Sequence, residues 1–235
     1  MKVLSFDTSG KATSAAVVVD GLLLGEVTLN TAINHSVTLM PTVDFLMAQV
    51  GLKAEDLTRI AVAQGPGSYT GLRIAVTAAK TLAWTLGIEL VDVSSLAAIA
   101  ARVHSDNMVI VLMNARRGMV YAGGYKEGKH LIKDQLISLQ ELLPRLARHK
   151  SLIFTGDADM FSQEILDKLP QAVILSEAPF NLPSAYEIAK LSEKLLPVEN
   201  IHDFNPIYLK KVEAEEKWEV ASGLRADDKD LVSRA

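Results

Sequence analysis

Residues 64–73 read Gln-Gly-Pro-Gly-Ser-Tyr-Thr-Gly-Leu-Arg, the most distinctive stretch of the sequence. It follows an apolar run typical of a strand. Two glycines around a proline predict a rigid turn, and Ser68 is expected to cap the helix that comes next. The free N–H groups at the start of such a helix can hold an anion, but the same arrangement also serves as a plain strand-to-helix connection. Spacing alone leaves both interpretations open.

Outward from this turn, the pattern predicts three strands, a helix, a strand, a helix, a strand and a helix within residues 1–104. Asp20-Gly21 between two β-rich runs predicts a hairpin. The same order returns after residue 105, with capping boxes that begin at Ser138 and Ser184. Two copies of βββαβαβα predict a duplicated α/β fold with an N-terminal half (1–104) and a C-terminal half (105–235) that ends in a polar tail.

The composition is that of a folded protein, with 49% hydrophobic and 22% charged residues among 235. No cysteine is present, which excludes disulfides and thiolate metal sites. The N-terminus turns polar too early for a secretory signal, and no apolar run has membrane-spanning length, so we expect a cytoplasmic protein that does not contact membranes. A net charge of -4 predicts that any contact with RNA is indirect.

Two expected helices, residues 36–50 and 68–86, are short of polar side chains. The second carries only Arg73 and Lys80 as charges, and a small residue recurs at every fourth position. Helices that are apolar nearly all round are usually buried on more than one side. We therefore expect a helix-on-helix interface with another subunit, or a homodimer when the chain is alone. The alternative is that the second half or the C-terminal segment covers these helices. The expected partner-binding residues are Val37, Met40, Val43, Met47, Gly71, Ala75, Ala79, Lys80 and Ala83.

A second set of candidates concerns phosphate. Asp7-Thr8 follows the first strand, where phosphotransferases of a duplicated fold place an aspartate near metal-bound phosphate, although an Asx turn explains the pattern equally simply. Near Gly156 a single glycine replaces the pair that a second phosphate loop needs, which disfavours a kinase. A basic turn between two strands adds two arginines. The candidates for nucleotide or anion binding are Asp7, Thr8, Gly67, Ser68, Arg116 and Arg117.

Metal and catalytic sites are not predicted. The five histidines are scattered, with no pair at the spacing that one helical face requires, and no cysteine can replace them. No nucleophile stands in a recognisable pair with a base, so no residue is assigned as catalytic.

These segments together resemble the bacterial TsaB (YeaZ) family, the non-catalytic subunit of the machinery that makes threonylcarbamoyladenosine on tRNA. The likeness runs nearly end to end. The matching blocks are Asp7-Thr8-Ser9, residues 35–41, residues 65–73, residues 80–83, Val93-Ser94-Ser95-Leu96, Ala115-Arg116-Arg117-Gly118 and residues 206–209.

The resemblance implies a fold of the ASKHA superfamily, the RNase H-like architecture of actin-like ATPases. The catalytic relative TsaD carries a His-x-x-x-His metal motif, and the matching positions here are Ser95 and Ile99, so its reaction is not assigned to this chain. The implied role is an accessory subunit without intrinsic activity that binds and stabilises TsaD, in an assembly that also includes TsaE.

The resemblance also implies a reaction for that assembly. The complex moves a threonylcarbamoyl group onto the adenosine beside the anticodon of tRNAs that read codons beginning with A. No cofactor is expected to bind tightly, although ATP or ADP at the subunit interface is compatible with the family. The alternative is an independent enzyme of this superfamily, a phosphotransferase or a peptidase, that uses Asp7.

Overall fold

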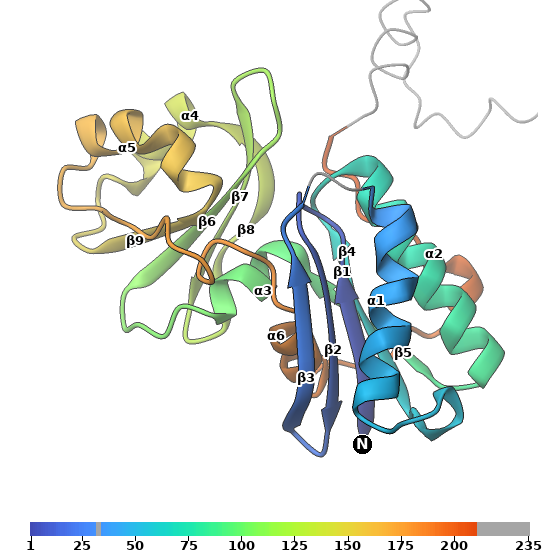
Figure 1. Ribbon diagram of the computed structural model, residues 1–235. Helices are drawn as coiled ribbons and strands as arrows, with labels where there is room; N and C mark the ends of the chain where they lie inside the picture. The colour runs from blue at the N-terminus through green and yellow to red at the C-terminus, as the bar shows by residue number, and fades with distance from the viewer. Residues whose placement is uncertain (32–33, 211–235) are drawn as a thin grey trace, which may run out of the picture.

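Two five-stranded mixed sheets form the protein, and the computed structural model describes residues 1–31 and 34–210 (Figure 1). In the first sheet the order is β3-β2-β1-β4-β5, with β1 antiparallel to β2 and parallel to β4. Asp20 and Gly21 have φ values of 48° and 79°, which confirms the predicted hairpin between β2 and β3. The strands are β1 (Lys2–Asp7), β2 (Thr13–Val19), β3 (Leu22–Leu29), β4 (Arg59–Gly65) and β5 (Glu89–Ser94).

The second sheet repeats this arrangement in the order β10-β9-β6-β7-β8, with β6 antiparallel to β7 and parallel to β9. The strands are β6 (Met108–Asn114), β7 (Met119–Lys126), β8 (Lys129–Ser138), β9 (Leu152–Gly156) and β10 (Val173–Ile174). The repeated βββαβαβα order confirms the duplicated α/β fold of the ASKHA type.

The helices begin close to where the sequence predicts them. Ser68, Ser138 and Ser184 cap their helices as expected, but Asn34 rather than Ser36 caps α1, because its side chain accepts a hydrogen bond from the Ser36 N–H. Within residues 1–31 and 34–210, no helix combines the length and apolar character that a bilayer crossing requires. The α-helices are α1 (His35–Gln49), α2 (Tyr69–Leu86), α3 (Ser95–Ala101), α4 (Leu139–Leu146), α5 (Ser162–Lys168) and α6 (Ala185–Ser192), and the 3-10 helices are η1 (Ala54–Asp56), η2 (Asp157–Phe161) and η3 (Ile201–Asp203).

Helices cover both faces of the first sheet. Figure 1 shows α1 and α2 side by side on one face, where they share a core with alternate residues of β1 and β4. The opposite face is covered by α3 and α6, whose Ala98 and Ile188 pack against the other set of alternating residues, such as Val3 and Ala61. The alternation follows from the period of two along a strand.

The predicted boundary near residue 105 separates the two sheets, but the C-terminal half is not a continuous unit. The chain returns to the first sheet at α6, where Glu26 of β3 accepts hydrogen bonds from the Ser184 hydroxyl (2.7 Å) and the Tyr186 N–H (3.1 Å). Residues from 184 onward therefore pack with the N-terminal half, because the buried Glu26 carboxylate satisfies the free N–H groups at the start of α6.

The glycines of residues 64–73 are required by close backbone contacts. A β-carbon at Gly65, Gly67 or Gly71 would overlap with the carbonyl oxygen of Ile207, Ser9 or Thr8, respectively. The Ser68 N–H donates to the Ser9 carbonyl at 2.7 Å, and the Ile207 N–H donates to that of Gln64 at 2.8 Å. The turn is therefore a junction that joins α2 to the β1–β2 hairpin and to the C-terminal segment.

We predict that Gly71→Ala lowers the free energy of unfolding by about 3 kcal/mol, because the added methyl group would displace the Thr8 carbonyl. Helix propensity acts in the opposite direction, since alanine is favoured over glycine inside a helix. Urea denaturation followed by circular dichroism measures the change.

The matched control is Gly10→Ala on the same hairpin, where the nearest atom to a new β-carbon is the Met113 methyl at 3.8 Å. Its stability should stay within about 1 kcal/mol of the parent protein. Equal effects of the two substitutions would contradict the assigned role of the Gly71 contact.

Candidate functional site

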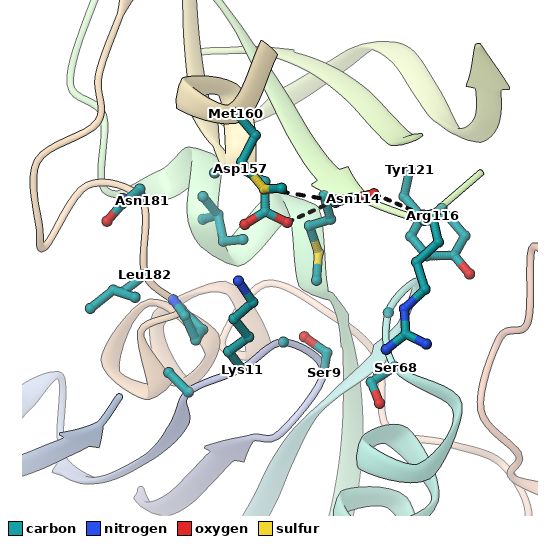
Figure 2. A pocket seen from close by; sticks show the side chains of 18 of the residues that line it. Ser9, Lys11, Ser68, Asn114, Arg116, Tyr121, Asp157, Met160, Asn181 and Leu182 are labelled. Atoms are coloured by element: carbon teal, nitrogen blue, oxygen red, sulfur yellow. Dashed lines mark hydrogen bonds between the residues drawn. The ribbon is translucent and has the colours of Figure 1, made fainter. Parts of the chain in front are cut away.

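A cleft of about 850 Å³ lies between the two halves (Figure 2). The first half contributes residues 9–12 after β1 and residues 67–70 at the start of α2. The second half contributes the β6–β7 turn, residues 114–117, and the β9–η2 junction around Asp157. The cleft is thus built at the carboxyl ends of β1, β4, β6 and β9, where sheets of this type place ligands.

Four of the six candidates for anion binding line this cleft: Gly67, Ser68, Arg116 and Arg117. The turn that presents the arginines is held by Asn114, whose Oδ1 accepts from the Arg116 N–H at 2.8 Å. Figure 2 shows the Arg116 side chain reaching from the second half toward Ser68. The structure therefore brings together residues that are almost fifty positions apart in sequence.

Asp7 and Thr8 are not among the residues that line the cleft. Both are buried, and the Asp7 Oδ1 accepts from the Ser9 N–H at 2.6 Å, which confirms the alternative Asx turn. The Thr8 hydroxyl donates to the Gly71 carbonyl at 2.7 Å. These side chains hold the hairpin against α2, so the expectation that they face a bound phosphate is corrected.

Sequence reasoning missed Lys11, which lines the cleft from the first half. Figure 2 shows its side chain pointing toward Asp157, whose Oδ2 accepts from the Asn114 N–H at 2.8 Å. Asp159 adds a second carboxylate to the lining. Carboxylates at the β9 end repel phosphate, which weighs against a triphosphate in this cleft. The signal for Lys11 was its place directly after Asp7-Thr8-Ser9-Gly10.

The metal motif of the catalytic relative has no counterpart here. Ser95 is fully buried in α3, and Ile99 lines the floor of the cleft with an apolar side chain. Across residues 1–31 and 34–210, no three His, Cys, Asp or Glu side chains come together as metal ligands would.

The other candidate surface is the outer helix face, defined here as the solvent side of α1 and α2. Four large apolar side chains are exposed on it: Val37 (61%), Met40 (43%), Phe45 (55%) and Trp84 (64%). Side chains of this size are normally removed from water, and together they form a surface suited to a protein partner.

The remaining helix residues expected to contact a partner lie inside the protomer. Val43, Met47 and the stripe Gly71, Ala75, Ala79 and Ala83 are buried in the core beneath the two helices. The prediction that this stripe faces another subunit is therefore wrong. Its small side chains instead let α2 lie close to its own sheet.

Lys80 is occupied by the C-terminal segment. Its ammonium group donates to the carbonyls of His202 (2.8 Å) and Phe204 (2.7 Å), and the His202 ring lies 5.2 Å from that of Trp84. On this flank of α2, the alternative left open by the sequence is confirmed, since the chain covers its own helix.

Asp7 carries a test of the site's electrostatics. It is fully buried, its Oδ2 has no hydrogen-bond partner among the described residues, and burial raises the pKa of the carboxyl above its ordinary value of 3.8. Folding therefore favours the protonated form. Stability from this group is present at low pH and is lost as pH rises through the folded-state pKa.

We predict that Asp7→Asn raises the free energy of unfolding at pH 7 by about 1 kcal/mol or more, because asparagine keeps the acceptor for the Ser9 N–H and removes the buried charge. The gain should shrink toward pH 4. Thermal unfolding across this pH range measures it, with Asp106→Asn at an exposed position as the control. A loss of stability at pH 7 would contradict the assignment.

Comparison with known proteins identifies the family. A family model described as TsaD, tRNA N6-adenosine threonylcarbamoyltransferase, matches residues 23–218. The tRNA threonylcarbamoyladenosine biosynthesis protein TsaB of Bacillus subtilis is 37% identical over 93% of this chain and 98% of its own length. The protein of the same name from Haemophilus influenzae is 25% identical, with 92% and 99% covered.

Solved structures agree with this. YeaZ from Pseudomonas aeruginosa superposes with a TM-score of 0.74 at 25% identity, over 88% of this chain and 99% of that one. The chain therefore belongs to the TsaB (YeaZ) family of tRNA threonylcarbamoyladenosine biosynthesis proteins.

Proposed function

We propose that this protein is an accessory subunit that binds a TsaD threonylcarbamoyltransferase through the outer helix face and supports threonylcarbamoyl transfer to tRNA. The observation that carries the proposal is the exposure of Val37, Met40, Phe45 and Trp84 on two adjacent helices. A matching apolar helix pair on the partner would remove these side chains from water, which is the main favourable term in association.

The absence of assigned catalytic groups fits a supporting role. Asp7 is engaged in an Asx turn, and the positions of the relative's metal motif hold Ser95 and Ile99. We propose that TsaE joins the same assembly, that tRNA is contacted through the complex, and that ATP or ADP binds, if at all, where the subunits meet. Alone, the chain would cover its outer helix face by forming a homodimer.

We predict that Val37→Glu and Met40→Glu each weaken binding to TsaD by about tenfold or more, since a carboxylate would be buried without a partner. Isothermal titration calorimetry measures the affinity. Both side chains are exposed in the protomer, so the variants should fold. Ala79→Glu is unsuitable, because Ala79 is fully buried in the protomer's own core.

The control is Leu131→Glu, which places the same charge at a 57% exposed apolar position on β8 of the second half. It should leave the affinity unchanged. Wild-type affinity in both helix variants would overturn the proposed interface.

A second prediction concerns activity. In a reconstituted reaction with TsaD, TsaE, tRNA and the threonylcarbamoyl adenylate, omitting this chain should abolish modification, and Met40→Glu should lower its rate in parallel with the loss of affinity. Nucleoside analysis by mass spectrometry measures the product. Full modification without the chain, or modification by the chain alone, would contradict an accessory role.

A further inference from the structure

The C-terminal strap, residues 201–210, is fixed to the first half at several points. Lys80 of α2 donates to two of its carbonyls, and Phe204 enters the core beneath α1 and α2. Further along, the Tyr208 ring lies 4.7 Å from that of Tyr69, and its hydroxyl accepts from Arg73 Nε at 3.2 Å. The strap therefore runs along α2 as far as the turn that opens the helix.

The end of the strap contacts the second half. The Lys210 ammonium donates to the Ala115 carbonyl at 2.7 Å, in the β6–β7 turn that presents Arg116 and Arg117 to the cleft. Leu209 packs against the apolar cluster of the second half that contains Met113 and Tyr121. One segment thus joins the outer helix face to the cleft wall.

The strap lies at the end of the cleft opposite to the backbone connections. Figure 2 shows Asn181 and Leu182 at one end and Arg116 and Tyr121 at the other. Asn181 belongs to the connection that returns to α6. Arg102, in the other connection between the halves, donates to the Pro179 carbonyl at 2.9 Å, so the two connections lie together.

Two halves joined at one end can rotate about that end as a hinge, whereas a tie at the opposite end fixes the angle. We propose that the C-terminal strap sets the angle between the halves and so couples the outer face of α2 to the cleft. Lys80 and Lys210 are the two positioning residues of this tie. A partner that binds over α2 and shifts the strap would then change the width of the cleft. Only this last step rests on the proposed function.

The chain contains no cysteine, so spin labels can be placed without removing native thiols. Glu55→Cys and Glu164→Cys put one label at an exposed position in each half. Double electron–electron resonance then gives the distance distribution between the halves. We expect one narrow distribution in the parent protein, and a broadened, shifted one in both Lys80→Met and Lys210→Met.

The Lys80 variant separates coupling from a local effect, because Lys80 does not line the cleft. Lys210→Arg retains a donor for the Ala115 carbonyl and should restore the parent distribution, and Lys150→Met at an exposed position should leave it unchanged. Circular dichroism establishes that each variant is folded. Parent-like distributions in both methionine variants would overturn the proposal.

Addition of TsaD gives the final arm. The distribution should shift in the parent protein, and the shift should be lost in Lys80→Met. Binding without any shift would refute the coupling and leave the proposed function intact. Failure to bind in calorimetry would refute the proposed function, while the comparison of strap variants without a partner would still decide whether the strap sets the angle.

Discussion

Three backbone carbonyls that occupy the space of absent β-carbons hold the N-terminal half together. Those of Thr8, Ser9 and Ile207 approach Gly71, Gly67 and Gly65 so closely that no side chain fits. The contacts bring the β1–β2 hairpin, the start of α2 and the C-terminal strap to one point. The edge of the cleft and the position of the strap both depend on this junction, since each is anchored within a few residues of it.

The same junction explains why the glycine-rich turn does not act as an open phosphate loop. Such loops point their N–H groups at the ligand, with glycine removing side chains from its path. Here the Ser68 N–H is used by Ser9, and the space freed by each glycine is filled by protein carbonyl oxygen, which repels an anion. The cleft beyond it has mixed charge, with Lys11 and Arg116 facing Asp157 and Asp159.

The two helices above the junction divide their apolar residues between two tasks. Small residues on the inner side of α2 let the helix approach the sheet, and Leu39, Val43 and Leu46 of α1 complete the core. The large side chains left outside, with Val37 the most exposed on α1, form the surface for association. Fold stability and partner binding are thus assigned to opposite sides of the same helices, so they can be altered independently by mutation.

The sequence by itself determined the duplicated βββαβαβα order, the hairpin at Asp20-Gly21, three of the helix caps and the family. These features depend on local periodicity, turn chemistry and short motifs, which a linear pattern records. Only the tertiary structure decided which side of α2 is buried, that Lys80 binds the strap, that Lys11 faces the cleft, and that α6 returns to the first sheet. A helix that is apolar all round has no pattern to distinguish its inner side from its outer side, and contacts between residues over a hundred positions apart leave no local signal.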